Sequence, residues 1–188
     1  MTKSDFPASL IRDLFTYEDG LLSWRMRPQS LFRTKRACSV WNARFARKLA
    51  GHVHVSRSGT RRKTIITILG TSERHLSSRL IWTWHHGEWP SGLIDHEDGD
   101  TLNDSIGNLR DVTSAGNSKN MRMHPGNTSG VTGVCWHKKL GKWKAEIMAN
   151  RVKKHLGVFD NIEDAAAARK AAERMLGFHP NHGRASHV

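Results

Sequence analysis

The chain has 188 residues, of which 30 are Lys or Arg and 17 are Asp or Glu, so its formal net charge is +13. This length allows one large domain or two small ones, and the seven tryptophans argue against disorder. The absence of a run of about 18 apolar residues excludes a membrane-spanning helix, and the N-terminus lacks the apolar stretch of a secretory signal. Two cysteines cannot build a disulfide framework. A pI near 10.4 indicates a polyanionic partner, most often nucleic acid.

The positive charge is spread unevenly along the chain. Residues 1–50, 51–90 and 128–188 carry net charges of +6, +4 and +6, whereas residues 91–127 carry −3. An acidic segment in a protein that binds nucleic acid repels phosphate unless a divalent cation reverses its sign. Charge alone leaves two explanations open for this segment, a metal site and a solvated acidic loop.

The first third of the chain shows helix, turn and strand signals in succession. Residues 6–15 have the spacing of a short helix, and Asp19-Gly20 then predicts a turn into the strand LLSWRMR. Residues 27–48 are basic and are expected to be irregular, either as a DNA-facing loop or arm or as a solvated charge run. The candidate DNA contacts in this segment are Arg33, Lys35 and Arg36.

A hairpin and a helix are predicted next. Residues 49–56 and 62–69 have the composition of two strands joined through Ser58-Gly59. A helix with an apolar stripe follows and ends near Gly87. Trp82 and Trp84 of this helix are expected to be core residues. The stripe consists of Leu76, Leu80, Ile81 and Trp84.

The last third of the chain predicts three strands and a helix. The stretch MHPGNTSG, residues 123–130, has the composition of a linker. The segments VTGVCWH, KWKAEIMA and RVKKHLGV then predict strands, and Asp160-Asn161 can cap an alanine-rich helix over EDAAAARKAAERML. In the middle strand Trp143, Ala145 and Ile147 face one way, and the opposite face carries Lys142, Lys144, Glu146 and Met148.

The acidic segment between these parts predicts a strand, a loop, a strand and a helix. A short strand ends in Asp95-His96, and a turn-rich loop follows over residues 98–107. Residues 108–112 have the composition of a returning strand, and Thr113 or Ser114 can cap a helix that carries Asn117 and Asn120.

The residues of this segment suit phosphodiester cleavage. Oxygen ligands such as the Asp95 carboxylate and the Asn117 amide suit Mg²⁺ or Mn²⁺, and His96 can act as a general base near neutral pH. Asp98 and Asp100 are either outer partners of the metal or, the favoured alternative, turn-forming residues. His85 and His86 either contact phosphate or are simply exposed at the end of their helix. Asn103 and Asp104 are interpreted as ordinary loop residues.

Residues 50–121 resemble the HNH endonucleases with a ββα-metal fold, in particular the phage and homing type. The resemblance rests on a helix that ends in Gly, then Pro, Asp-His-x-Asp-Gly, Asn-Leu-Arg and a later Asn. It implies that Asp95 and Asn117 bind one divalent metal ion, that His96 is the general base, and that Asn108 braces the loop and keeps His96 aligned. Many members carry a final His where this chain has Asn117, and Asn occurs at this position in the homing branch, so the departure narrows the subgroup.

Residues 130–182 resemble an AP2 DNA-binding domain through SGVTGVCWH, GKWKAEI, LGVF and the alanine-rich segment. The resemblance implies a three-stranded antiparallel sheet on one helix, with the outer face of the sheet in the major groove. Because lysine lacks the bidentate fork of arginine, looser base recognition is expected. The implied DNA contacts are His137, Lys138, Lys139, Lys142, Lys144, Lys153 and His155.

Together these patterns predict an α+β chain that acts on double-stranded DNA as a metal-dependent endonuclease. It is expected to be phage-encoded, to act in the host cytoplasm away from membranes, and to be a monomer or weak dimer. A DNA-binding regulator with a nuclease-like fold is the alternative, and an RNA binder is disfavoured because an exposed Phe/Tyr platform is missing. The predicted parts are an extension with a basic loop (1–48), the nuclease domain (49–122), the linker (123–130), the AP2-like domain (131–182) and a tail (183–188).

Overall fold

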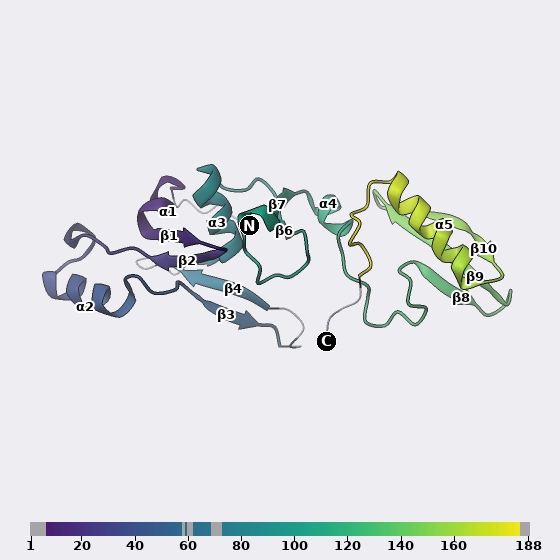
Figure 1. Cartoon of the computed structure of the whole chain (residues 1–188), viewed down its shortest axis with the longest axis horizontal. Helices are drawn as coiled ribbons and strands as arrows, with labels where there is room; N and C mark the ends of the chain where they lie inside the picture. The colour runs from purple at the N-terminus through teal and green to yellow at the C-terminus, as the bar shows by residue number, and fades with distance from the viewer. Residues whose placement is uncertain (1–6, 58, 60–61, 69–72, 185–188) are drawn as a thin grey trace. The chain divides into compact units, whose positions relative to one another are not determined.

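The computed structural model describes residues 7–57, 59, 62–68 and 73–184. The chain divides into two compact units, Met1–Asp111 and Val112–Val188, and small sheets and helices alternate in it (Figure 1). The α+β prediction is therefore confirmed. The border between the units falls inside the segment predicted as the nuclease domain, while residues 123–130 contain no helix or strand. In the described part of the chain, no helix has the length and apolar character needed to cross a membrane.

The first unit begins with a short helix and a hairpin. Helix α1 spans Ser9–Leu14, and strands β1 (Phe15–Glu18) and β2 (Leu21–Trp24) pair antiparallel. The predicted turn is confirmed, because Asp19 and Gly20 both have positive φ, 44° and 83°, as a two-residue hairpin turn requires. The predicted helix was too long at both ends, since α1 begins at Ser9 and Phe15 already belongs to β1.

The prediction of an irregular basic arm over residues 27–48 was wrong. A 3₁₀ turn, η1 (Gln29–Leu31), leads into the 11-residue helix α2 (Lys35–Phe45). The Thr34 hydroxyl caps this helix by accepting from the Ala37 N–H at 3.1 Å. Cys38 and Trp41 are three residues apart and face inward, so packing of this stripe makes the segment helical despite its charge.

The predicted hairpin and helix are confirmed, except that Leu76 of the predicted helix stripe belongs to an additional strand of the sheet. Strand β3 (His52–Val55) pairs with β4 (Arg62–Thr67), and β4 pairs with β5 (Arg74–Leu76). Ser58 and Leu69 of the predicted hairpin lie outside the described residues. Helix α3 (Ser77–His86) ends at Gly87, whose φ of 76° is the left-handed conformation of a helix C-cap.

One aromatic and aliphatic core joins the elements of the first unit. Trp82 and Trp84 are partly buried against it, as predicted. Arg27 is 8% exposed, and its guanidinium lies 5.0 Å from the Trp24 ring centroid and 4.2 Å from that of Trp41. Burial lowers the pKa of Arg27. The buried core residues are Ile11, Leu14, Phe15, Leu22, Trp24, Trp41, Ala50, Ile66, Ile68, Leu80, Ile81 and Leu109.

The acidic segment folds in the predicted order. Strands β6 (Leu93–His96) and β7 (Leu109–Val112) form a two-stranded sheet, and η2 (Ile106–Asn108) precedes β7. Helix α4 (Ser114–Ser118) follows, and Thr113 caps it by accepting from the Gly116 N–H at 3.1 Å. Asn117 lies within α4, whereas Asn120 lies beyond its end.

The second unit contains the predicted three-stranded antiparallel sheet and helix. Strands β8 (Val134–His137), β9 (Lys142–Ala149) and β10 (Val152–Phe159) have the order β10-β9-β8. Helix α5 (Ile162–Met175) packs on this sheet. Asn161 caps it by accepting from the Asp164 N–H at 2.8 Å.

The two faces of the sheet differ as predicted. Ala145 and Ala165 are fully buried, so that β9 and α5 approach closely, and Ile147 is also buried. Trp136, which the sequence left undecided between core and surface, is 48% exposed and contacts Trp143 edge-on with 5.2 Å between ring centroids.

Candidate active site

Strand β6 carries two adjacent polar residues that are both buried. Asp95 and His96 are 9% and 8% exposed. Neighbouring side chains of a strand point to opposite faces, so each of the two needs a partner of its own. Burying a polar group without a hydrogen-bond partner costs about 1–3 kcal/mol, and a charged group costs more. The partners of these two residues therefore define the site.

Asp95 pairs with a cation on the neighbouring strand. The Arg110 guanidinium, on β7, donates from Nη2 to the Asp95 Oδ2 atom at 2.5 Å. Arg110 belongs to the Asn-Leu-Arg sequence that carried part of the family resemblance, although no role was predicted for it. The sequence feature that pointed to this contact was the position of Arg110 on the predicted returning strand.

His96 pairs with a residue that the sequence predicts to be a plain loop position. Its Nε2 atom lies 2.8 Å from Oδ1 of Asp104, and Asp104 is only 4% exposed. An ionised carboxylate can only accept a hydrogen bond, so Nε2 carries the proton of this contact. Asp104 is therefore a functional candidate that was missed. The position of Asp104 in the sequence did not predict this contact, because Asp104 is eight residues from His96 and reaches it only through the fold of the loop.

Hydrogen bonds within the loop hold its shape. The Asn108 amide accepts from the Asp98 N–H at 3.0 Å and donates to Asp98 Oδ1 at 3.0 Å and to the Asn103 carbonyl at 2.7 Å. Asp98 also accepts from the Asn103 amide at 2.7 Å and from the Asp100 N–H at 2.7 Å. Burial opposes ionisation of Asp98, yet these hydrogen bonds lower its pKa. Asp98 and Asp100 thus act as turn formers, the favoured alternative.

The β1–β2 hairpin supports the other side of this loop. The Tyr17 hydroxyl accepts from the Ile106 N–H at 3.2 Å. Gly20 packs so closely that a Cβ atom there would lie 2.8 Å from the Ser105 backbone nitrogen. The residue next to Asp104 is therefore in contact with a hairpin that lies more than 80 positions earlier in the chain.

The entry to β6 is braced by a second carboxylate. Asp111 accepts hydrogen bonds from the Ser91 hydroxyl at 2.9 Å, the Ser91 N–H at 2.7 Å and the Gly92 N–H at 2.8 Å. Burial opposes ionisation, but these bonds lower the pKa of Asp111. Arg79 donates to the Gly92 carbonyl at 2.8 Å, which ties the same turn to α3.

The two histidines at the end of α3 belong to its C-terminal packing. His85 contacts Tyr17 edge-on with 4.5 Å between ring centroids, and burial, followed by the charges of His86 and Arg12, lowers its pKa. The Arg12 guanidinium donates to the Trp84 and His85 carbonyls at 2.6 and 3.0 Å. This contact caps the negative end of the helix.

Asn117 and Asn120 lie in the second unit. Asn117 is half-buried in α4, where its N–H donates to the Thr113 carbonyl at 2.9 Å. Asn120 is 3% exposed, and its side-chain oxygen accepts from Arg184 Nη1 at 2.9 Å. Asn120 therefore holds the C-terminal segment of its unit.

The donor chemistry fits a hard divalent cation. Mg²⁺ is usually held by one or two protein oxygens, with water and phosphate as its remaining ligands. In the first unit the Asp95 carboxylate is an oxygen donor of this kind, whereas Asn117, the other predicted ligand, belongs to the second unit. Among the described residues, no group of three or more His, Cys, Asp or Glu side chains could form an all-protein metal cage.

The predicted DNA contacts of the second unit lie on the strands of its sheet and in the turn between β8 and β9. Glu146, on β9, pairs with Lys144 at 3.1 Å and with Lys153 at 2.7 Å, and the hydrogen bond from Lys153 is the main cause of its lowered pKa. Lys138 and Lys139 are exposed in the turn between β8 and β9 and pair with no described carboxylate. The remaining three are His137 on β8, Lys142, which pairs with Asp160 at 3.0 Å, and the exposed His155 on β10.

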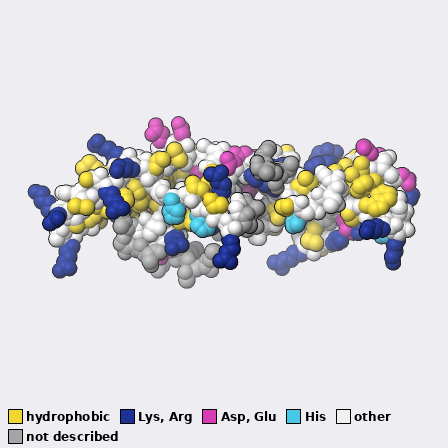
Figure 2. Space-filling model, turned by 90° about the horizontal axis from the view of Figure 1, so that it is seen from below, with side chains coloured by type: hydrophobic (Ala, Val, Ile, Leu, Met, Phe, Trp, Pro, Cys, Tyr) yellow, Lys and Arg dark blue, Asp and Glu magenta, His cyan; other side chains and the backbone are white. Residues whose placement is uncertain are grey.

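The first unit carries a second basic surface, around α2. Residues 20–72 contain 12 Lys or Arg and no Asp or Glu. Arg33, Lys35 and Arg36 are exposed at the start of α2, and Figure 2 shows Lys and Arg side chains gathered over this helix. The predicted contacts thus belong to a helix and its cap, where the sequence analysis expected a loop.

Comparison with known proteins identifies a family match over the segment that contains Asp95, His96 and Asp104. An HNH endonuclease family model matches residues 75–119, which run from β5 through α4. Protein 3.8 of Escherichia phage T7 is 33% identical over 117 residues, which cover 62% of this chain and 94% of that protein. No solved structure matches the chain.

The close approach of Gly20 to the Asp104 loop predicts a matched pair of substitutions. Gly87→Ala should cost about 1 kcal/mol of unfolding free energy, because Gly87 has φ 76° but nothing within 4 Å of a new Cβ. Gly20→Ala should cost at least about 2 kcal/mol, since it adds a clash to the same backbone strain. Urea unfolding of the full chain measures both values, and equal costs would contradict the close packing.

Proposed function

We propose that this chain, which belongs to the HNH endonuclease family, is a metal-dependent endonuclease that hydrolyses phosphodiester bonds in double-stranded DNA. The products are a 5′-phosphate and a 3′-hydroxyl. The proposal places the reaction at β6, where Asp95 and His96 are adjacent and buried. The observation that carries it is the contact between His96 and Asp104 at 2.8 Å, inside the segment that matches the family model.

The proposed reaction uses His96 as a general base. His96 accepts a proton from a water molecule, the water oxygen attacks phosphorus, and the bond from phosphorus to the 3′ oxygen breaks. The electron pair of that bond leaves with the 3′ oxygen, which then takes a proton from solvent. Asp104 balances the positive charge that the imidazole gains, because its carboxylate lies on Nε2. Asn108 keeps the loop that carries Asp104 in place.

Asp95 and Asn117 are the proposed ligands of one divalent ion, Mg²⁺ or Mn²⁺. When bound, such an ion offsets negative charge on the phosphate and on the departing oxygen. Arg110 orients the Asp95 carboxylate through its bond to Oδ2. The remaining coordination positions are left to water and to the DNA phosphate.

The second unit is proposed to be an AP2-like DNA reader, and the whole chain to be of the phage or homing type. Lys138 and Lys139 supply exposed charge for the phosphate backbone. Lys144 and Lys153 share Glu146, so their charge is partly offset on that face. The reader is therefore expected to contribute affinity with loose base recognition. Arg33, Lys35 and Arg36 at α2 provide the second proposed contact with DNA.

A DNA-binding regulator without catalysis is the competing function. The ion pair between Arg110 and Asp95 favours it, because a carboxylate that a guanidinium already satisfies needs no metal ion. Cleavage of DNA in the presence of a divalent metal ion separates the two functions.

His96→Ala should abolish most cleavage. Loss of a general base lowers the rate by about 10²–10⁴-fold. The measurement is the nicking of a supercoiled plasmid with Mg²⁺ or Mn²⁺, with chelator as a blank. His54→Ala, which removes an exposed histidine of β3, is the control and should cut like the native chain. Undiminished cleavage by His96→Ala would contradict the role of His96 as general base. No cleavage by the native chain would favour the DNA-binding regulator.

Asp104→Asn should lower kcat while leaving KM for DNA nearly unchanged. An amide cannot balance the charge of an imidazolium, so a loss of at least about tenfold in kcat is expected. Asp100→Asn, which keeps an acceptor for the Leu102 N–H, is the control in the same loop and should retain activity. A rise in KM without a change in kcat would assign Asp104 to DNA binding or folding instead.

Lys139→Ala should weaken DNA binding in a salt-dependent way. The slope of log affinity against log salt should become less steep by about 1, the release of one counterion. The assay titrates the full chain with a fluorescent duplex in EDTA at several salt concentrations. Arg174→Ala removes an exposed cation of α5 and should leave the slope unchanged. Equal slopes for the native chain and Lys139→Ala would exclude this lysine as a phosphate contact.

A further inference from the structure

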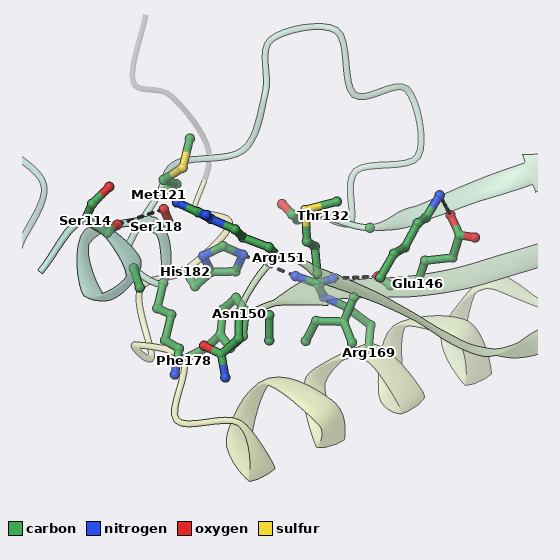
Figure 3. A pocket seen from close by; sticks show the side chains of 17 residues that line it. Ser114, Ser118, Met121, Thr132, Glu146, Asn150, Arg151, Arg169, Phe178 and His182 are labelled. Carbon is green, nitrogen blue, oxygen red and sulfur yellow. Dashed lines mark hydrogen bonds and ion pairs between the residues drawn. The ribbon is translucent and has the colours of Figure 1, made fainter.

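The second unit contains a cavity of about 710 Å³ that the proposed reaction does not use. It lies among α4 and the residues after it, the β9–β10 turn, and the C-terminal segment that includes Phe178 and His182 (Figure 3). All of its lining residues belong to this unit. Sites for small molecules occupy about 300–1,000 Å³, so this cavity can hold a ligand of nucleotide size.

The walls of the cavity combine apolar side chains with positive charge. The larger apolar side chains are those of Met121, Ile147, Met148 and Phe178. Four cations, Lys119, Arg151, Lys153 and Arg169, also line it, and of these Arg169 is paired with the buried Glu173 at 2.9 Å. Glu146 is the single carboxylate in the lining. Glu146 is already paired with Lys144 and Lys153. The cavity therefore favours a ligand with an apolar or planar part and a negative group.

Arg151 is held in an uncommon backbone conformation beside this cavity. The β9–β10 turn has positive φ at Asn150 and at Arg151, 52° and 65°. Such a turn favours Asn followed by Gly, and a side chain at the second position costs about 1 kcal/mol. Figure 3 shows the Arg151 side chain lying beside Met121 and His182. It forms no ion pair with a carboxylate in the described part of the chain.

His182 places an unused hydrogen-bond donor in the same wall. The side chain is 7% exposed, and its Nε2 atom lies 3.3 Å from Arg169 Nη2. Because arginine can only donate, Nε2 accepts and the proton of the neutral ring sits on Nδ1. Burial, which outweighs the charge of Glu173, lowers the pKa of His182 and keeps the ring neutral.

Two buried polar atoms beside the cavity lack a hydrogen-bond partner. Within the described residues, neither His182 Nδ1 nor the Thr132 hydroxyl oxygen has one. Both residues line the cavity. A buried donor without an acceptor costs about 1–3 kcal/mol, so an oxygen-bearing ligand in the cavity would recover this free energy.

We propose that this cavity is a binding site for a nucleotide. Its phosphate lies against Arg151 and Lys119, its oxygen atoms accept from His182 and Thr132, and its base packs against Met121, Met148 and Phe178. Phosphate supplies the strong acceptors that cations and N–H donors require, and the base supplies the planar group that the apolar wall requires. The nucleotide comes either from a DNA strand or from the free pool, and only the first source rests on the proposed endonuclease function.

The test is calorimetric titration of the full native chain with deoxyadenosine 5′-monophosphate in EDTA, where no metal-dependent cleavage occurs. Arg151→Gly removes the cation and relieves the left-handed backbone strain, so this variant should fold at least as well as the native chain. It should bind the nucleotide at least about tenfold more weakly, the loss of one charge-assisted contact. Arg174→Ala, outside the cavity, should bind like the native chain.

Further titrations identify the recognised group and its source. Deoxyadenosine and inorganic phosphate should each bind more weakly than the nucleotide, and phosphate binding as tightly would overturn the base contact. A single-stranded oligonucleotide that competes with the nucleotide indicates a DNA source, and one that does not compete indicates a free nucleotide. Equal affinity of the native chain and Arg151→Gly, or no binding at millimolar nucleotide, would overturn the site. Because these titrations need no cleavage, an inactive chain would contradict the proposed function alone.

Discussion

The pairing of two buried polar side chains at the end of β6 constrains the rest of the first unit. Asp95 and His96 each need a partner, and the chain supplies Arg110 from the next strand and Asp104 from the connecting loop. An unpaired buried charge would cost more free energy than a typical hydrogen bond contributes. The loop therefore has to return Asp104 to one place, and its other hydrogen bonds serve that end.

Support for this loop comes from parts of the chain that are remote in sequence. Asn108 closes the loop on Asp98 and Asn103, while Tyr17 and Gly20 of the β1–β2 hairpin hold the backbone that follows Asp104. The hairpin is itself anchored by the aromatic core. The N-terminal part of the chain is thus a structural support of the candidate site as well as a carrier of positive charge.

Positive and negative charges occupy different parts of the chain. Positive charge without any carboxylate runs through residues 20–72, and the carboxylates near the candidate site are held by hydrogen bonds. Those bonds lower the pKa of Asp98 and Asp111 against the effect of burial. These two carboxylates are therefore structured groups with hydrogen-bond partners, which distinguishes them from the charges of a merely solvated loop.

Local patterns in the sequence determined most of the secondary structure and the position of the candidate site. The turn at Asp19-Gly20, the end of α3 at Gly87, the strands of the second unit and the Asn161 cap all follow from short-range backbone preferences. Helix α2 was missed because its basic composition outweighed a short buried stripe in the prediction. Only the tertiary structure paired His96 with Asp104, placed Arg27 beside two tryptophan rings and formed a cavity beside Arg151. Those contacts depend on how loops close in space, which residue spacing along the chain does not encode.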